Sequence, residues 1–318
     1  MRKQIIFLAA MAIALVACNK SETIVTESAD EISFKAVSSV ATKADPEVVG
    51  TTLPSKDYIL YVTAARVGAT PAAYFFNESQ FVTESTATPL AAGDQFKASP
   101  ALYWPVGGAR LDFLAIACKS ADKTTLNPTW TPVGVMTTAS WDTWTNQIDL
   151  LYASHNGASK ATTTALEFKH AQALLAFQAQ ASFAGQITIT NIEIEDLEHT
   201  GTFTVNNTKN NIEASWDITA SGKKAVKGMS NYPVTASMAD VTCDNLLVPQ
   251  QGKKNITVTY TIAGNEYKYT LNNERTIWEA GKKYVYQFNM TLTEIVFTES
   301  VSDWDTMSPA GNIEVPVN

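Results

Sequence analysis

The stretch KKYVYQFNMTL, residues 282–292, identifies the fold class because apolar side chains recur in it at every second position. One face of the stretch collects five such residues: Tyr284, Tyr286, Phe288, Met290 and Leu292. Successive side chains of a β-strand point to opposite faces of its sheet, whereas an α-helix would place apolar residues three or four positions apart. The stretch is therefore predicted to be a strand with one buried face.

The same period predicts a hairpin and several shorter strands. NITVTYTIAGNEYKYTL, residues 255–271, alternates on both sides of Gly264-Asn265, which predicts a hairpin that turns there. The first half of the chain is less regular, and loops rich in Pro, Gly, Asn and Thr separate its strand candidates. These candidates are KDYILYVTAARV (56–67), ALYWP (101–105), ARLDFLAIAC (109–118) and DLLYA (149–153). LDFLAIAC is almost entirely apolar, which is typical of a strand buried on both faces.

Two stretches of the second half need a further argument. ITITNIEIEDL, residues 187–197, changes phase after Ile189, and a β-bulge near Thr190-Asn191 would return its isoleucines to one buried face. AQALLAFQAQA, residues 171–181, consists of Ala, Leu, Gln and one Phe, and its propensity favours a helix. Because the preceding ALEF alternates and the surroundings are β, we interpret this stretch as a strand.

Length and composition bound the architecture. The chain has 318 residues, of which 45% are hydrophobic, and this is enough for more than one core. We predict an all-β protein with antiparallel sheets in two tandem domains, residues 31–163 and 164–318, with the boundary in GASKATTTA (157–165). Acidic residues outnumber basic residues, 31 to 23, and no basic cluster stands out in the sequence. This charge balance argues against nucleic acid as a partner.

The N-terminus has the three parts of an export signal. Arg2 and Lys3 form a charged head, and residues 5–16 form an apolar core that is too short to span a membrane. LVAC, residues 15–18, then looks like a bacterial lipobox, in which Cys18 is acylated and residues 1–17 are removed. Residues 18–30 would be a polar tether between the lipid and the folded body. The alternative is an ordinary cleaved signal with an incidental cysteine.

The sequence carries no catalytic, phosphate-binding or dinucleotide-binding motif, so we expect neither an enzyme nor a cofactor. Its three histidines, His155, His170 and His199, lack the spacing of metal ligands. An acidic cluster contains Glu193, Glu195, Asp196 and Glu198. It lacks the glycine of a calcium loop, so a solvated strand face is favoured over a metal site.

The tryptophans and cysteines each allow two interpretations. Trp130, Trp141 and Trp144 lie close together in a polar stretch and could stack on sugars, although packing within the protein is favoured. Cys118 and Cys243 could form a disulfide in an exported protein. Two buried free thiols are favoured, because each cysteine lies in a separate strand-like stretch.

Two short segments near the ends of the chain alternate apolar and polar residues. The first presents Ile32, Phe34 and Ala36 on one face, and the second presents Ile313, Val315 and Val317. Each segment has the shape of a plug for a groove in a sheet. SSVATKADPE, residues 38–47, follows the first segment and offers Lys43 to a trypsin-like protease. The alternative is an ordinary first strand, loop and tail strand within one domain.

The order of these segments resembles the fimbrillin family of Bacteroidetes, which comprises the subunits of type V pili and their minor relatives. The matching stretches are the lipobox, ISFKAVSSVATKA, LYWPVGGARLDFLAIA, DLLYAS, ALEFKHAQALLAFQA, ITITNIEIEDLEHTGTF, LLVPQ, IWEAGKKYVYQFNMTLTEIVF and SVSDWD. Together they extend from Cys18 to residue 305, and the most specific are ALEFKHAQA and WEAGKKYVYQF. The resemblance implies two transthyretin-like β-sandwich domains and makes AQALLAFQAQA a strand.

The resemblance also implies a role for the two end segments. The precursor would reach the outer membrane as a lipoprotein, with residues 31–43 masking a groove of its first domain. A Lys/Arg-specific protease would cut between Lys43 and Ala44 and remove the masking strand. The vacated groove would then accept residues 313–317 from the next subunit. The implied function is that of a structural, adhesion-related fimbrium subunit at the cell surface, with other fimbrillin subunits as partners.

Two departures from the family pattern define the alternatives. Many stalk subunits are cut after arginine rather than lysine, and Pro316 lacks the N–H that a strand paired on both sides would use. A tip or anchor subunit would tolerate both departures. The remaining alternative is a non-polymerising cell-surface lipoprotein that binds glycan or host protein.

Overall fold

The computed structural model describes residues 30–35, 58–69, 73–85, 94–119, 128–132, 134–140, 148–160, 164–183, 186–208, 211–225, 231–241, 245–247, 250–251, 255–272, 277–291 and 294–303. Within these ranges the regular elements are all β-strands, and none is a helix. The prediction of an all-β fold is thereby confirmed. Over the same ranges we find no helix of the length and apolarity that a membrane crossing requires.

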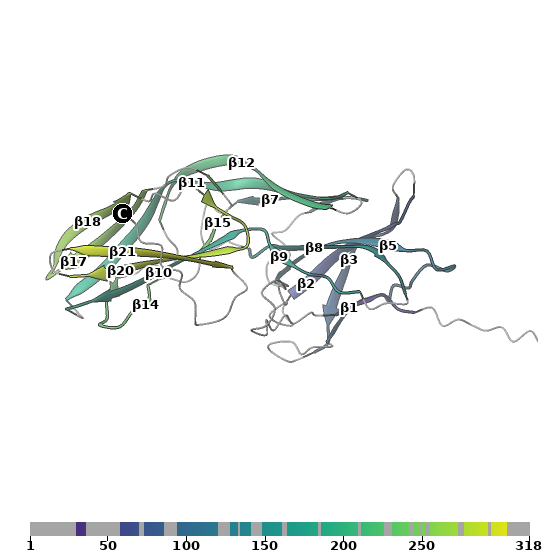
Figure 1. The fold of residues 1–318 in the computed structure, drawn as a ribbon, viewed down its shortest axis with the longest axis horizontal. Helices are drawn as coiled ribbons and strands as arrows, with labels where there is room; N and C mark the ends of the chain where they lie inside the picture. Colours follow the sequence, from purple (N-terminus) through teal and green to yellow (C-terminus); the bar gives the residue numbers. More distant parts are fainter. Residues whose placement is uncertain are drawn as a thin grey trace, which may run out of the picture.

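A seven-stranded antiparallel sheet organises the first half of the chain (Figure 1). In spatial order its strands are β1 (Ser33–Lys35), β4 (Gln95–Ala98), β3 (Tyr74–Thr83), β2 (Tyr58–Arg66), β5 (Leu111–Lys119), β8 (Leu151–Ala158) and β9 (Lys169–His170). Strands β2 and β5 are buried on both faces: Leu60 and Phe113 point into one core, and Ile59 and Ile116 point into another. The near-continuous apolar sequence of β5 is explained by this position.

Two further sheets form the second half. One contains β14 (Ala239–Asp240), β10 (Ala173–Ala181), β20 (Lys282–Met290) and β21 (Ile295–Asp303), and β15 (Asn245–Leu247) also pairs with β10. The other contains β18 (Asn265–Asn272), β17 (Asn255–Ile262), β11 (Ile187–Thr208), β7 (Gly134–Ser140) and β6 (Thr129–Thr131), with β12 (Asn211–Ala225) and β13 (Tyr232–Pro233) also on β11. A small sheet joins β16 (Gln250–Gln251) to β19 (Ile277–Trp278).

The periodic stretches behave as predicted. Four alternate residues of β20, from Tyr284 to Met290, are at most 1% exposed and face a common core. In β11 the pairing with β17 shifts register between Ile189 and Asn191, and the isoleucines on both sides of the shift are fully buried. The predicted strand over AQALLAFQAQA is β10, whose Phe177 lies in the same core, so tertiary packing overrides its helix propensity.

Three details differ from the predictions. The hairpin of β17 and β18 turns at Ala263-Gly264, one residue earlier than expected, because Ile262 pairs with Asn265 and both turn residues take the positive φ of this tight turn, 48° and 83°. The ALYWP stretch forms no strand and makes only one bridge, from Tyr103 to Glu31. Strands β10 and β20 are parallel, so the described sheets are not purely antiparallel.

Strand β11 is long enough to connect the two halves. Its first part pairs with β17, and its last part, from Thr200, pairs with β7, while β12 pairs with it from Glu193 to Thr208 (Figure 1). That last part packs with Phe203 and Val205 against β2 and β5, in a core that also contains Trp130. Strands from both predicted domain ranges therefore share one sheet, since β6 and β7 lie within residues 31–163.

Gly201 permits the close approach of β11 and β12. A Cβ atom at this position would lie 2.8 Å from the backbone oxygen of Asp217 and 3.3 Å from the Trp216 ring. We expect Gly201→Ala to lower the free energy of unfolding by about 1–3 kcal/mol, because the backbone oxygen has no room to retreat. Urea denaturation measures this loss. Ser215→Ala, on the exposed face of β12, is the control and should change stability by less than about 0.5 kcal/mol.

Candidate functional site

The segment 30–35 is joined to β4 of the first sheet and to residues 102–104. Strand β1 pairs antiparallel with β4, with Phe34 opposite Phe96. Before β1, the Ile32 N–H donates to the Leu102 carbonyl at 2.7 Å, and the Trp104 N–H donates to the Asp30 carbonyl at 3.0 Å. Among the described strands, β1 lies at the end of the sheet order. It is therefore an edge strand that could leave without breaking a ladder between two other strands.

The side chains of this segment nevertheless lie in the centre of a core. Ile32 and Phe34 are fully buried. The Phe34 ring lies 4.9 Å from the Phe81 ring and 5.1 Å from the Phe113 ring, both in edge-to-face contact. Phe113 belongs to β5, which three strands separate from β1 in the sheet order. The sheet must curl for these rings to meet, and β1 thereby covers the face formed by β2 and β5.

Apolar burial dominates the energetics of this segment. Burying one large apolar side chain stabilises a fold by about 1.5–3 kcal/mol. The Lys97 ammonium lies 3.3 Å from the Glu31 carboxylate, but both side chains are partly exposed, 52% and 31%, so this pair adds at most about 1 kcal/mol. We define the groove as the surface of β4, β3, β2 and β5 that Ile32 and Phe34 cover.

Most of the other predicted site residues lie outside the described part of the chain. These are Cys18, Ala36, Lys43, Ala44, Cys243, Trp141, Trp144, Ile313, Val315 and Val317. The roles assigned to them stay predictions. Cys118 is fully buried in the core between β5 and β11, and Trp130 is 9% exposed in the same core, as favoured from the sequence.

The histidines and acidic residues are dispersed. His155 donates a hydrogen bond from Nδ1 to the Ala165 carbonyl, His199 contacts Thr200, and His170 contacts Asp149. The acidic residues of 193–198 lie within β11, and only Asp196 among them is exposed. Over the described ranges, no group of three or more His, Cys, Asp or Glu side chains could hold a metal ion.

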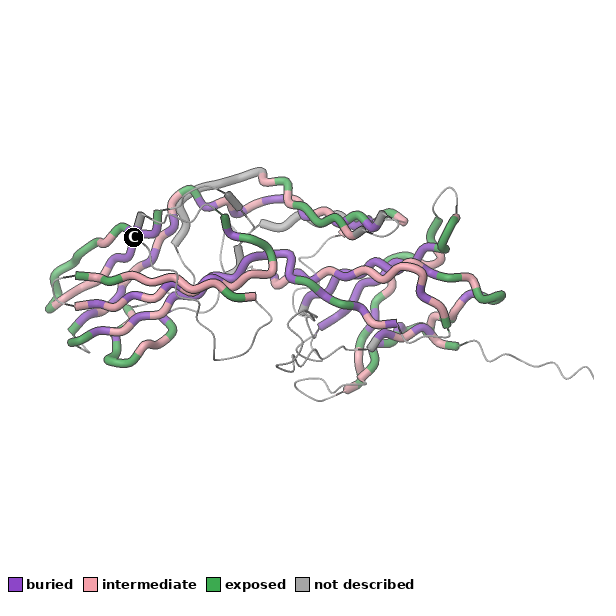
Figure 2. The backbone as a smooth tube through the Cα atoms, in the orientation of Figure 1, coloured by how far each residue is buried: buried purple, intermediate pink, exposed green. Residues whose placement is uncertain are grey.

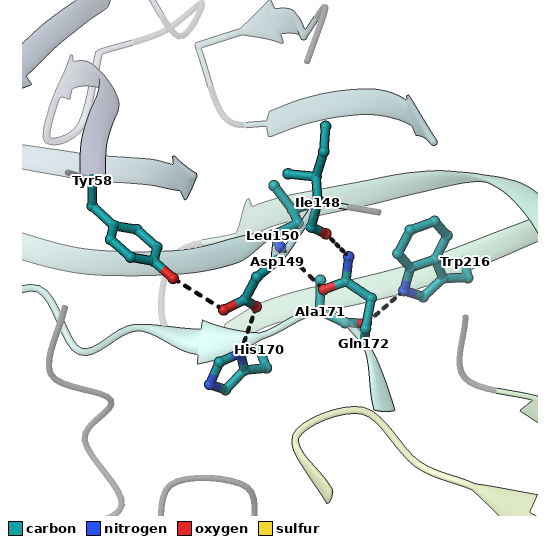
Figure 3. A network of polar contacts seen from close by, with 8 residues as sticks. All are labelled: Tyr58, Ile148, Asp149, Leu150, His170, Ala171, Gln172 and Trp216. Atoms are coloured by element: carbon teal, nitrogen blue, oxygen red, sulfur yellow. Dashed lines mark hydrogen bonds and ion pairs between the residues drawn. The ribbon is translucent and has the colours of Figure 1, made fainter. Parts of the chain in front are cut away.

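A polar network that the sequence did not reveal clamps the connection from β9 to β10 (Figure 3). The buried Gln172 donates to the Ile148 carbonyl at 2.6 Å and accepts from the Leu150 N–H at 3.1 Å. One residue earlier, the Trp216 indole N–H donates to the Ala171 carbonyl at 2.7 Å. Backbone groups of the first half and a side chain of β12 thus hold the same short segment.

Next to Gln172, three side chains from different elements meet (Figure 3). Nδ1 of His170 lies 2.7 Å from Oδ1 of Asp149, and the Tyr58 hydroxyl donates to Oδ2 of Asp149 at 3.2 Å. His170 is 7% exposed. We define the joint as residues 170–172 with Tyr58, Asp149 and Trp216. The only sign of the joint in the sequence is Gln172, a glutamine within an apolar run.

Two tyrosines near the core that joins the two halves have raised pKa values. Burial raises the pKa of Tyr152, which packs against the core between the two halves. Burial also raises the pKa of Tyr61, and Cys118 and Glu78 add to the effect. Both phenols therefore stay neutral at physiological pH. At the end of β21, a hydrogen bond to Asp303 raises the pKa of Lys282, so the Lys282 ammonium stays charged.

The arrangement of strands is shared with solved bacterial structures. A candidate cell adhesion protein from Bacteroides uniformis matches with a TM-score of 0.58 at 17% identity, covering 88% of this chain and 99% of that one. A fimbrial protein from Bacteroides vulgatus matches with a TM-score of 0.54 at 12% identity, covering 79% and 93%. At these identities the likeness establishes a common fold.

The family follows from the sequence itself. The model of the fimbrillin-like family matches residues 42–304, so this chain belongs to the fimbrillin-like family. The resemblance inferred from the segment order is confirmed. None of the curated proteins matches the chain.

Proposed function

We propose that the protein is a structural subunit of a type V pilus, with a role in adhesion, that assembles by protease-triggered strand exchange. The observation that carries this proposal is the state of the segment 30–35. Its side chains complete a core, yet among the described strands β1 pairs with β4 alone. Family membership and the fold shared with a fimbrial protein support the same class.

The order of the N-terminal segments suits a single activating cut. Cys18, the proposed lipid attachment site, and β1 both precede Lys43. Cleavage between Lys43 and Ala44 would therefore release the body from the outer membrane and free the groove at the same time. Until then, β1 protects apolar surface that would otherwise associate wrongly during export.

The proposed donor strand has the spacing that the groove requires. Ile313, Val315 and Val317 repeat every second residue, as Ile32 and Phe34 do. Alternate side chains would enter the groove while the backbone pairs with β4. Pro316 is compatible with this pairing because an edge strand has one side without ladder bonds.

The decisive experiment treats the purified precursor with a Lys/Arg-specific protease. We expect a new N-terminus at Ala44 and a ladder of oligomers that resist mild denaturant. If every mature copy on the cell surface keeps an acylated Cys18 and stays monomeric, the strand-exchange proposal is wrong. A surface lipoprotein that binds glycan or host protein, or an anchor subunit, would then take its place.

The donor strand has its own test. Changing both Ile313 and Val315 to Asp should abolish the ladder, because two carboxylates cannot enter an apolar groove without a large desolvation cost. The control Asn312→Asp adds a charge at a position of opposite parity and should leave the ladder intact. Size-exclusion chromatography after cleavage measures both. An unchanged ladder in the double variant would rule out residues 313–317 as the donor.

A further inference from the structure

The molecule is elongated, and turns gather at its two ends (Figure 1). At one end, Arg66 pairs with Leu111, Leu111 pairs with Ala158, and the Val67 N–H donates to the Arg110 carbonyl at 3.0 Å. These contacts bring together the turn after β2, the turn before β5 and the end of β8. At the other end, the turns that follow β10, β17 and β20 meet, as the Ser182 N–H donates to the Met290 carbonyl and Ile187 pairs with Ile262.

The turns at the end formed by β2, β5 and β8 are largely exposed, and two of them carry a valine (Figure 2). Val106 is 93% exposed, the largest value among the exposed large hydrophobic residues described, and Val67 is 47% exposed. Gly68, Gly107 and Gly108 have φ between 73° and 85°, and no atom would lie within 4 Å of a Cβ added to any of them. Single exposed apolar side chains are common on protein surfaces, but two of them at the apices of neighbouring turns are available to an external partner.

The charges of the two ends are opposite. At the end that carries Val67 and Val106, the turns comprise residues 66–74, 104–110 and 158–163. Their charged residues are Arg66, Arg110 and Lys160. In the turns of the other end, at residues 182–186, 263–266 and 291–294, they are Glu266 and Glu294. The described charged residues of both sets are exposed, and Phe183, 46% exposed, lies beside the acidic pair of turns. We call the first set the basic end and the second set the acidic end.

Side chains of the opposite sign near each end reduce this contrast without reversing it. The exposed Glu78 lies near Tyr74 at the basic end, and the exposed Lys268 lies two residues after Glu266 at the acidic end. Asp112 accepts a hydrogen bond from the Gly157 N–H at 2.7 Å and thus belongs to the β5–β8 ladder. Asp30 is bonded to Trp104 and would leave with the masking strand on cleavage. The basic end therefore becomes more positive when the groove opens.

The position of the groove identifies the partner. The segment 30–35 enters the sheet beside Trp104, two residues before Val106. A copy that supplies a strand to this groove must therefore lie next to the basic end. In that copy β21 runs from the acidic end to Asp303, and nine residues separate Asp303 from Ile313. Nine extended residues span about 30 Å, and β21 is about as long. A linker that runs back beside β21 can therefore bring Ile313 to a point just beyond the acidic end.

We propose that the basic end of one copy docks on the acidic end of the next copy during assembly. This inference rests on the strand exchange proposed above, and it identifies the surface that aligns two subunits before or while the strand is exchanged. Val67 and Val106 contact the apolar surface around Phe183, and the basic side chains face Glu266 and Glu294. Opposite charges at such a rim chiefly accelerate association, and this acceleration weakens with added salt.

The experiment measures the rate of oligomer formation after Lys/Arg-specific cleavage, together with binding of a synthetic peptide of residues 312–318 to cleaved monomer. Val106→Asp and Arg110→Glu should each slow oligomer formation about tenfold. Both should leave peptide binding unchanged, because neither residue lines the groove. Ile277→Asp is the control, because it also adds a charge at an exposed apolar residue, 43% exposed, but one away from both ends. Ile277 lies near the joint: the nearby Gly281 N–H donates to the Gln172 carbonyl. This control should assemble at the wild-type rate.

A charge reversal separates this contact from a folding defect. Glu294→Arg alone should slow assembly as Arg110→Glu does. A chain that carries both substitutions should regain at least half of the lost rate. In its fibres, Glu at position 110 of one copy meets Arg at position 294 of the next, so the attraction between the two ends is restored. If single variants assemble at the wild-type rate while the peptide binds, end-to-end docking is overturned and strand exchange stands. If wild-type protein neither assembles nor binds the peptide, strand exchange fails and this inference fails with it.

Discussion

Replacing Phe34 with alanine is expected to lower the free energy of unfolding of the uncleaved precursor by about 3–5 kcal/mol. The ring is fully buried and meets Phe81 and Phe113 at centroid distances of 4.9 and 5.1 Å. Neither neighbour can collapse into the space, because each belongs to a paired strand of the sheet. Denaturant titration of the precursor, followed by tryptophan fluorescence, measures the loss.

The same variant distinguishes a removable strand from an ordinary one. After cleavage and separation of the N-terminal fragment, wild type and Phe34→Ala are identical chains and should have identical stability. Ser33→Ala, on the opposite and half-buried face of β1, is the control and should cost less than about 1 kcal/mol in the precursor. A loss from Phe34→Ala no larger than that of the control would show that β1 contributes little to the core.

The second large effect is expected at the joint, where Gln172→Leu should lower the free energy of unfolding by about 2–6 kcal/mol. Gln172 is fully buried and bonds both the Ile148 carbonyl and the Leu150 N–H. Leucine fills a similar volume but leaves these two backbone groups buried without partners, at about 1–3 kcal/mol each. Equilibrium unfolding in urea measures the sum.

A matched substitution on the solvent side isolates the effect of burial. Gln178 lies on β10 as well, and it bonds Asp240 and Gln287 across the outer face of the sheet. Water can replace those partners, so Gln178→Leu should cost less than about 1 kcal/mol. Equal losses in the two variants would mean that the joint is no more demanding than the surface.

The joint would bear load if the protein assembles into the proposed pilus. The segment 170–172 leads directly from β9 of the first sheet into β10 of the second half. Hydrogen bonds to residues 148–150 and to Trp216 restrain it on two sides, and the core of β2, β5 and β11 restrains it further. In the pilus proposed above, a subunit built in this way would transmit tension between its ends through packed strands rather than through a loose linker.

The features that depend on side-chain period could be predicted from the amino-acid order alone. The strand β20, the phase change of β11 at Asn191 and the two-sided burial of β5 follow from which neighbouring residues are apolar. Such patterns are local, because each side chain of a strand takes its face from its position along the chain. The alternation at Ile32 and Phe34 belongs to the same class, and both residues are buried as that pattern requires.

Which strands meet could be learned only from the folded chain. The alternating pattern of β1 does not indicate that the sheet curls and brings Phe34 onto Phe113. Likewise, AQALLAFQAQA does not indicate that its strand pairs in parallel with β20. The joint and the opposite charges of the two ends likewise arise from residues far apart in sequence. Strand order sets these contacts, and many orders are compatible with one alternating pattern, so local chemistry cannot choose among them.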